Sequence, residues 1–149
     1  MRFLLLIVLT ISSFTVVAQN KKDVREADRL FKKEQYAEAM PMYRKFIDID
    51  PSNMDYVYKF GGCMLMVTDK TDEALKLLLK AEKMGKKDEE ISYFIGRAYE
   101  KKEQFNDAIM YYEKFSDSAT KEDLKALKIK KRIKDCQKAQ KALDKAKKE

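Results

Sequence analysis

The stretch that decides the fold is EQYAEAM at residues 34–40, because the near copy EQFNDAI follows at residues 103–109. Ala74 falls between the matching alanines Ala39 and Ala108, so that the three stand 35 and 34 residues apart. A period of about 34 residues is typical of repeats built from two antiparallel helices. The small number of turn residues, 4 Gly and 2 Pro in 149, also favours helices joined by very short turns. We therefore predict an all-α fold of three helical hairpins.

A second set of small residues falls at the same spacing in the first helix of each expected hairpin. Small side chains on two facing helices let their backbones approach closely. Glycine costs about 1 kcal/mol in a helix interior relative to alanine, so its presence there indicates close packing. The predicted repeat-packing positions are Ala27, Gly61 and Gly96 in the first helices and Ala39, Ala74 and Ala108 in the second helices.

This pattern resembles the tetratricopeptide repeat family. The matching residues are the pairs Phe60-Gly61 and Ile95-Gly96, then Tyr99, Ala108 and Tyr112, and the closing Asp50-Pro51. The resemblance implies a helical-hairpin solenoid whose first helices line a concave groove. It implies three repeats within residues 19–118, at about 21–52, 53–87 and 88–118.

Residues 119–149 are expected to form a C-terminal capping helix with a lysine-rich tail. Thr120, with Asp123 three residues later, is a capping box that starts a helix. Apolar residues from Leu124 to Leu143 then recur mostly three or four apart. We predict one helix from residue 121 to near Lys147, whose part up to about residue 140 covers the exposed end of the third repeat, as stacked repeats require.

The net charge of +7 lies in this C-terminal region. Residues 119–149 hold 12 Lys and Arg against 5 Asp and Glu, whereas residues 1–118 hold 20 of each kind. The repeats are therefore near neutral, and the tail is the segment suited to anionic lipid or another acidic polymer.

Residues 1–18 have the pattern of a secretory signal peptide. Arg2 precedes an apolar stretch, and Val16 and Ala18 supply the small residues that precede a cut. We predict cleavage after Ala18 and an exported, periplasmic protein. An uncleaved membrane anchor is disfavoured because the stretch 3–18 has only sixteen residues, whereas a spanning helix needs roughly 20.

The composition argues against catalysis. The chain has no His, which excludes a His-based triad, an imidazole base and a His-ligated metal. Two cysteines cannot complete a four-thiolate site, and Cys63 and Cys136 are expected to be separate thiols rather than a disulfide. The acidic pairs Asp72-Glu73 and Glu89-Glu90 are ordinary solvated helix starts. We predict a non-enzyme with no catalytic residue, no metal and no cofactor.

The helical register of the expected first helices gives a candidate peptide-binding groove. Aromatic, methionine and cationic side chains on this face suit an extended or helical peptide, although about half of them are expected to pack between helices. The groove residues are Phe31, Tyr58, Leu65, Met66, Tyr93, Arg97 and Lys101. The positions that hold a peptide carboxylate in one variant of the family carry Val24, Asp28 and Lys59 here, so that variant's function is not expected.

Two functions remain open. The first hypothesis is a periplasmic scaffold that binds a protein or peptide in the groove. The second is envelope anchoring, in which the lysine-rich C-terminal helix binds anionic lipid or an acidic polymer. Nucleic acid is not expected as a partner, because export removes it and the tail lacks interleaved aromatic residues.

A closer resemblance refines the first hypothesis. The stretch YAEAMPMY at 36–43, the Ala18/Gln19 cut and IKDCQKA at 133–139 resemble the N-terminal part of Bacteroidetes outer-membrane-associated proteins. Those proteins join tetratricopeptide repeats to a β-propeller and an OmpA-like peptidoglycan-binding domain, and some serve type IX secretion and gliding. The resemblance implies a periplasmic location and protein binding. It is not extended to peptidoglycan binding because the sequence ends at Glu149, before either later domain. A short relative and a truncated one both stay open.

Overall fold

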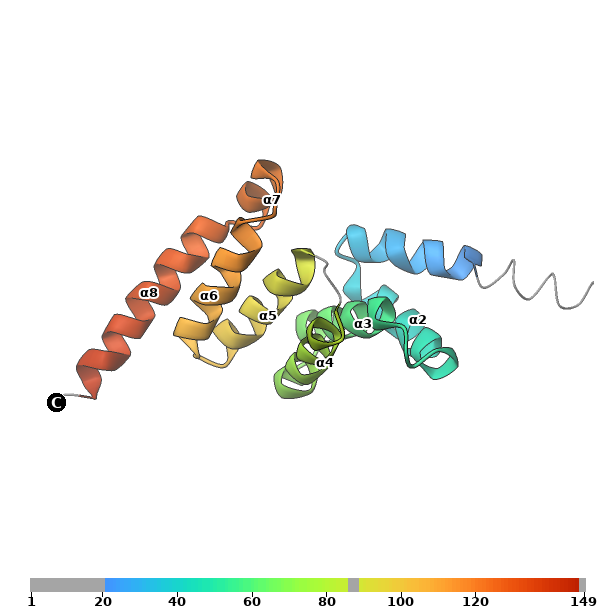
Figure 1. Cartoon of the computed structure of the whole chain (residues 1–149), viewed down its shortest axis with the longest axis horizontal. Helices are drawn as coiled ribbons and strands as arrows, with labels where there is room; N and C mark the ends of the chain where they lie inside the picture. The colour runs from blue at the N-terminus through green and yellow to red at the C-terminus, as the bar shows by residue number, and fades with distance from the viewer. Residues whose placement is uncertain (1–20, 86–88, 148–149) are drawn as a thin grey trace, which may run out of the picture.

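The computed structural model describes residues 21–85 and 89–147 (Figure 1). The predicted signal peptide, residues 1–18, lies outside the described residues. Helix 21–32 comes first, and the helices after it are α2 (Tyr36–Ile49), α3 (Met54–Val67), α4 (Thr71–Lys83), α5 (Glu89–Lys101), α6 (Phe105–Ser116), α7 (Lys121–Ala126) and α8 (Ile129–Ala146). Helix 21–32 with α2, α3 with α4, and α5 with α6 form hairpins that follow one another along the long axis in Figure 1. The predicted all-α hairpin architecture is confirmed.

The repeated Glu-Gln pair forms the turn inside the first and third hairpins. Glu34 and Glu103 both have a left-handed backbone, with φ of 58° and 56°. The N–H of the following residue, Gln35 or Gln104, donates to the carbonyl five residues earlier at 2.9 and 3.0 Å. This hydrogen bond satisfies a terminal helix carbonyl and ends the helix. The sequence copy therefore corresponds to a copied turn.

The six predicted repeat-packing residues are buried where two helices meet. A Cβ atom added at Gly61 would lie 3.2 Å from the Leu77 Cβ, and one added at Gly96 would lie 2.8 Å from the Tyr112 ring. Both distances are shorter than an ordinary van der Waals contact between carbons. A methyl group at Gly96 would therefore force its neighbours to shift, and one at Gly61 would require a smaller adjustment.

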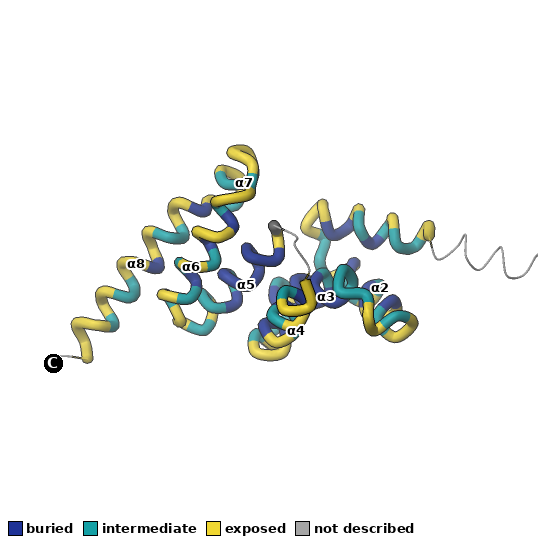
Figure 2. The backbone as a smooth tube through the Cα atoms, viewed as in Figure 1, coloured by how far each residue is buried: buried dark blue, intermediate teal, exposed yellow. Residues whose placement is uncertain are grey.

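The core runs through all three hairpins, as the buried segments in Figure 2 show. Phe31, at the end of helix 21–32, is its aromatic centre. Its ring lies 5.4 Å from Tyr36 and 6.0 Å from Tyr43 in the first hairpin, 6.1 Å from Tyr58 in the second and 5.6 Å from Phe94 in the third. Tilted and edge-on ring pairs at these distances stabilise a fold beyond the area that they bury. One side chain thus contacts every repeat.

The prediction of one continuous C-terminal helix is wrong. The capping box is confirmed, since the Thr120 hydroxyl accepts from the Asp123 N–H at 3.1 Å. However, α7 ends after six residues, and Lys128 takes a left-handed backbone with φ of 54° before α8 starts. Leu127 and Ile129 are two residues apart, which would place them on opposite faces of a continuous helix. The break allows Ile129 to be fully buried while α8 packs against α6.

The two cysteines are free and buried, which confirms that they are separate thiols. Cys63 is 0% exposed in the core of α3, and Cys136 is 2% exposed on α8. Burial raises the pKa of the Cys63 thiol to about 12 and that of Cys136 to about 11. Both thiols are therefore protonated, and poor nucleophiles, near neutral pH.

Candidate binding surface on the concave side

The concave side of the array holds two adjoining hollows of about 210 and 160 Å³, which we call together the concave hollow. The two parts share lining residues from three distant segments. These residues are Glu34 and Tyr36 in the first turn, Tyr93 on α5, and Ala126 and Leu127 at the end of α7. In Figure 1, helix 21–32 and α7 lie on the same side of the row of helices, consistent with this lining. The break after α7 thus helps to build the site.

The structure places four of the seven predicted groove residues around the concave hollow. Met66, Tyr93 and Arg97 line its larger part, and Phe31 and Tyr93 line its smaller part. Phe31 and Tyr93 are also core residues, with 4% and 5% of their surface exposed. A peptide could therefore contact little more than the edges of these two rings.

The other three predicted groove residues lie elsewhere. Tyr58 and Leu65 are 1% and 0% exposed and line neither part of the concave hollow. Lys101 is exposed at the end of α5, and its ammonium group donates to the Leu65 carbonyl at 2.7 Å. Helical register alone does not separate residues that face a groove from residues that pack against the next repeat.

Arg97 is fixed along the wall of the concave hollow. Its Nη1 donates to the Tyr93 hydroxyl at 3.0 Å, and its guanidinium carbon lies 5.9 Å from the centre of the Tyr93 ring. Its Nε lies 3.5 Å from Oε2 of Glu100. The planar guanidinium has five N–H donors, so these contacts leave donors for a ligand oxygen.

The C-terminal elbow, which we define as residues 126–132, contributes side chains that sequence analysis missed. Leu127, Lys128 and Arg132 line the larger part of the concave hollow. Nε of Arg132 donates to the Leu127 carbonyl at 3.3 Å, and its Nη1 donates to Glu100 at 2.9 Å. The two-residue spacing of Leu127 and Ile129 was the only sequence signal for this elbow.

The first turn also lines the concave hollow. Glu34 is the residue with the left-handed backbone, and Tyr36 packs edge-on against Phe31 at 5.4 Å and against Phe94 at 6.1 Å. Burial raises the pKa of Tyr36, so its hydroxyl is protonated at neutral pH and can donate a hydrogen bond. The copied Glu-Gln turn could have suggested these two residues, because a turn with a special backbone is held in one position.

The residues that line the concave hollow form a surface suited to binding. The larger part of the concave hollow has a mainly polar lining, to which Glu34, Arg97, Lys128 and Arg132 contribute charges and Tyr36, Met66, Tyr93 and Leu127 contribute apolar atoms. Such a surface takes a polar group with an apolar group next to it. In residues 21–85 and 89–147, no group of three or more Cys, Asp and Glu side chains is placed to hold a metal ion.

Among the described helices, none has both the length and the apolar composition that a membrane crossing requires.

The hairpins, the tightly packed small residues and the concave side define a tetratricopeptide-repeat-like solenoid. In particular, the fold is similar to the crystal structure of the P58(IPK) TPR domain, with a TM-score of 0.72 and 18% sequence identity. The alignment covers 89% of this chain and 36% of that chain, so this chain matches about a third of the other's length. At this identity the likeness concerns the fold alone. No protein-family model matches the chain, and no curated protein matches it in sequence.

Proposed function

We propose that this protein is a non-enzymatic scaffold that binds a segment of another protein in its concave hollow. The observation that carries the proposal is the way in which the hollow is assembled, from the first turn, α3, α5 and the elbow. A surface built by segments up to about a hundred residues apart forms only in the folded array, as expected for recognition by repeat proteins.

The ligand is a peptide segment that presents a carboxylate with an apolar side chain next to it. The apolar atoms of Tyr36, Met66 and Leu127 contact that side chain in a mainly polar hollow of about 210 Å³. Arg97 and Arg132 face the same space and already share the carboxylate of Glu100. Arginine recognises a carboxylate through paired N–H donors, so a ligand carboxylate adds to this pair.

The site of action is the periplasm, after removal of residues 1–18. The signal-peptide pattern and the resemblance to Bacteroidetes envelope proteins support this location, with a role in assembling the outer membrane or a secretion machine. N-terminal sequencing of exported protein is expected to start at Gln19, and a start at Met1 would contradict it.

Site-specific photocrosslinking in the producing cells tests the scaffold. A photoreactive residue replaces Met66, which lines the concave hollow, or Met110 on α6, which is 54% exposed. We expect position 66 to give a discrete crosslinked protein that position 110 does not give. Introducing Arg97→Glu into the position-66 variant should abolish this product. Equal products from both positions, or none from position 66, would contradict the proposal.

A second candidate function, anchoring to an anionic surface, is favoured by a lysine stripe on α8. Lys134, Lys138, Lys141 and Lys145 are all exposed and recur at four, three and four residues, which places them on one helix face. Such a stripe attracts anionic lipid headgroups. Binding to vesicles that contain phosphatidylglycerol should be salt-sensitive and should be lost when these four lysines are replaced by Gln. Unchanged binding by that variant would exclude the stripe.

A further inference from the structure

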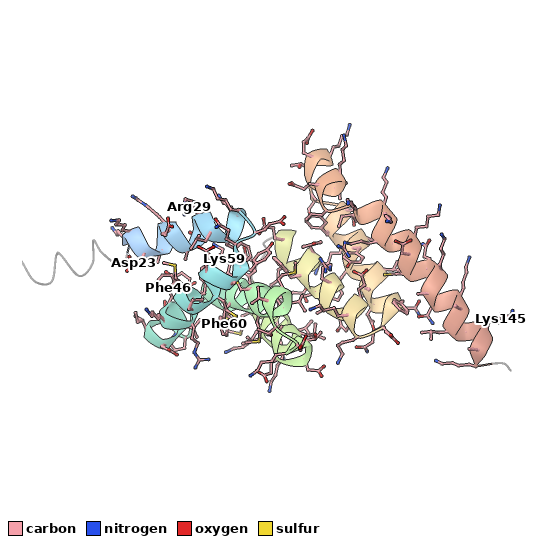
Figure 3. The ribbon with its side chains drawn as sticks, turned by 180° about the vertical axis from the view of Figure 1, so that it is seen from behind. Asp23, Arg29, Phe46, Lys59, Phe60 and Lys145 are labelled. Carbon is pink, nitrogen blue, oxygen red and sulfur yellow. The ribbon has the colours of Figure 1, made fainter. Side chains whose placement is uncertain are left out.

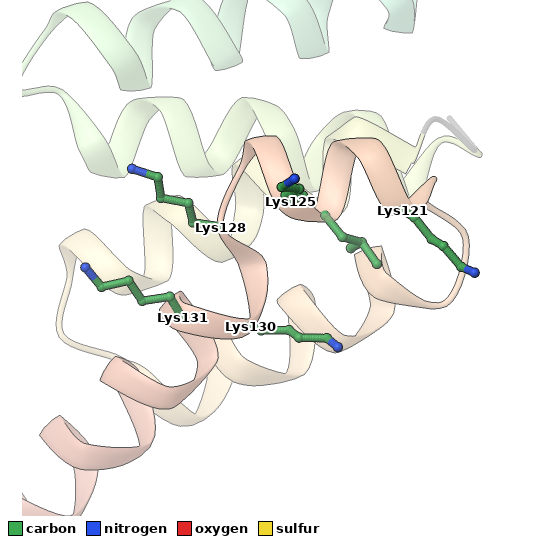
Figure 4. A pocket seen from close by; sticks show the side chains of 6 residues that line it. Lys121, Lys125, Lys128, Lys130 and Lys131 are labelled. Carbon is green, nitrogen blue, oxygen red and sulfur yellow. The ribbon is translucent and has the colours of Figure 1, made fainter.

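A further hollow lies between α7 and the start of α8. Its volume is about 670 Å³, and it is lined by Lys121, Leu124, Lys125, Lys128, Lys130 and Lys131. Leu124 and the methylene chains of the lysines form its apolar walls. Figure 4 shows the ammonium groups of Lys128 and Lys131 on one side and those of Lys121 and Lys130 on the other. We call this feature the lysine hollow.

The positive charge of the lysine hollow is not balanced in the described part of the chain. None of its five lysines forms an ion pair there, whereas in the repeats Lys59, Lys102 and Lys114 each pair with a carboxylate. Residues 121–131 hold five lysines against Glu122 and Asp123, a net charge of +3, so the lysines repel one another and an acidic partner removes that repulsion. The lysine hollow therefore has the charge of a surface that binds an acidic group.

The shape of the lysine hollow favours a protruding protein group over a flat lipid surface. A bilayer plane touches the rim of a concave surface and leaves its apolar floor at Leu124 uncovered. A projecting apolar side chain with carboxylates next to it can pack against Leu124 on the floor while its carboxylates pair with the lysines of the rim. The structure holds one such group, at the opposite end of the array.

This group is the segment Asp48-Ile49-Asp50 at the end of α2, which we call the Ile49 knob. Ile49 is 71% exposed, the highest value among the large apolar side chains in the described ranges. Asp48 is also exposed, and its only described ion pair is with Arg44 at 3.4 Å, which is a weak surface contact. Asp50, which follows Ile49, is half-buried, and its Oδ1 accepts from the Ser52 N–H at 3.2 Å and from the Ser52 hydroxyl at 2.7 Å. Because α2 and the elbow lie far apart in Figure 1, the two features of one chain do not meet.

We propose that the Ile49 knob of one copy docks into the lysine hollow of a second copy of this chain. Ile49 packs against Leu124, the exposed carboxylate of Asp48 meets the ammonium groups of the rim, and the carboxylate of Asp50 adds negative charge while it keeps its contacts with Ser52. The two contacting surfaces are different, so each docked pair retains one unused knob and one unused hollow. Such a contact joins copies head to tail, into a ring if the rotation between them closes and into an open chain if it does not. The inference is independent of any ligand in the concave hollow.

Two variants of the full chain, followed by sedimentation velocity at low ionic strength, test the proposal. The hollow variant carries Lys130→Glu and Lys131→Glu, and the knob variant carries Asp48→Lys and Ile49→Lys. Both changes suit their helices, because acidic residues stabilise a first turn and basic residues a last turn. We expect the unmodified chain to form larger species as its concentration rises, and each variant to associate about a hundredfold more weakly.

The mixture of the two variants gives the decisive result. The knob variant retains an intact hollow and the hollow variant an intact knob, so together they should form a dimer and nothing longer. A control with Lys76→Glu and Lys80→Glu, two exposed lysines on α4, should associate like the unmodified chain. Raising the salt to about 0.5 M should weaken association, because rim charges are screened.

Three results would overturn the proposal. They are an unmodified chain that stays monomeric at every concentration, variants that associate as it does, and a mixture that forms no dimer. If the monomeric chain instead binds phosphatidylglycerol vesicles and loses that binding with Lys130→Glu and Lys131→Glu, the lysine hollow belongs to a lipid.

Discussion

The two ends of the repeat array are held by related but differently charged contacts. At the first junction, where the first hairpin meets α3, the Tyr43 hydroxyl and the Lys59 ammonium both donate to Oδ1 of Asp28, at 2.8 and 2.7 Å. Lys59, labelled in Figure 3, also donates to Asp55 at 2.9 Å. Burial alone would lower the pKa of Lys59, but its two carboxylate partners outweigh burial and raise it. One cation is thus shared by two carboxylates.

The last junction, where the third hairpin meets α8, has the opposite arrangement of charges. The Tyr112 hydroxyl donates to Glu100, and Nη1 of Arg132 on α8 donates to the same carboxylate oxygen at 2.9 Å. Nε of Arg97 lies 3.5 Å from that oxygen. Burial, followed by the hydrogen bond to Glu100, raises the pKa of Tyr112. One carboxylate is thus shared by two guanidinium groups.

The difference shows which part of the contact the repeat copies. Tyr43 and Tyr112 are 69 residues apart, the same separation as the two copied turns. Their acceptors, Asp28 and Glu100, are 72 residues apart and so come from different repeat positions. Only the buried tyrosine is repeated, and each end supplies its own charges around the hydroxyl. The second repeat has Leu78 at this position and needs no such partner.

The largest loss of stability is expected from Phe31→Ala, which removes a ring that packs against both the first and the third hairpin. Phe31 contacts Tyr43 at the first junction and Phe94 on α5, and it is 4% exposed. Truncating a buried phenylalanine leaves a cavity and costs about 3–5 kcal/mol. Urea unfolding followed by circular dichroism measures the loss, and Phe105→Ala, at a half-buried site, is the control with a smaller cost. Equal losses for the two variants would contradict the central place of Phe31.

The contribution of each charge cluster to stability is measured by replacing its shared group, Lys59 at the first junction and Glu100 at the last. Lys59→Met leaves Asp28 and Asp55 without their cation, and Glu100→Gln leaves Arg97 and Arg132 without their anion. We expect each to cost about 2 kcal/mol, because half-buried charges lose their partner. Thermal unfolding checks both. Lys114→Met, which breaks the more exposed pair with Glu82, should cost less than about 0.5 kcal/mol. If Lys114→Met costs as much as Lys59→Met or Glu100→Gln, burial does not determine how strongly these ion pairs stabilise the fold.

The two ends also differ in the small residue at the repeat-packing position of the first helix. Gly96 packs against Tyr112, whereas the equivalent position at the first junction is Ala27. Gly96→Ala places a Cβ atom 2.8 Å from that ring, and we expect a loss of about 1.5 kcal/mol after the gain in helix propensity. Gly61→Ala, with its nearest contact at 3.2 Å, should cost less. Chemical denaturation of both variants measures the order, and the reverse order would contradict the packing.

The two buried cysteines, Cys63 on α3 and Cys136 on α8, predict how the free energy of unfolding depends on pH. The pKa of Cys63 is raised to about 12 and that of Cys136 to about 11, so the unfolded chain loses these protons first as the pH rises. The contribution of the two thiols to stability should therefore be constant below pH 9, the ordinary thiol pKa, and should fall above it by up to about 1.4 kcal/mol per pH unit for each thiol until its folded-state pKa is reached.

The measurement is unfolding between neutral and alkaline pH, with Cys63→Ala and Cys136→Ala compared at each pH. Each variant should show a shallower decline than the unmodified chain. Rapid alkylation of either thiol in the folded chain at neutral pH would contradict its burial.

The smallest effect concerns the two copied turns. Glu34→Gly and Glu103→Gly place glycine where the backbone has φ of 58° and 56°, a conformation that costs a side-chain residue roughly 1 kcal/mol. Since glycine also gains freedom in the unfolded chain, we expect a net stabilisation of about 0.5 kcal/mol for each. Glu113→Gly, on an exposed turn of α6, should destabilise instead. A shared sign for all three variants in thermal unfolding would contradict the turn assignment.

Much of the fold could be predicted because the repeat constrains it at several positions at once. The spacing of Ala39, Ala74 and Ala108 indicates the hairpins, and the start of α7 follows from the local hydrogen bond between Thr120 and Asp123. The candidate binding site was harder to predict from the sequence. Tyr58 and Leu65 occupy groove register but face the neighbouring repeat, which is a property of the packing between repeats.

The elbow shows why local patterns were insufficient. The apolar stripe from Leu124 to Leu143 satisfies helical spacing almost everywhere, and only the step from Leu127 to Ile129 departs from it. Lysine is not a residue that usually marks a left-handed backbone, so Lys128 gave no warning. The gain from burying Ile129 and Cys136 against the rest of the chain decides the conformation there.

The contact between Phe31 and Phe94 changes how the array should unfold. In repeat proteins, stability is approximately a sum of the stability of each repeat and of its contacts with immediate neighbours, so the ends fray independently. Here a ring of the first repeat lies 5.6 Å from a ring of the third. Opening either terminal hairpin therefore removes a contact from the other, and this coupling makes the loss of structure cooperative across a three-repeat chain.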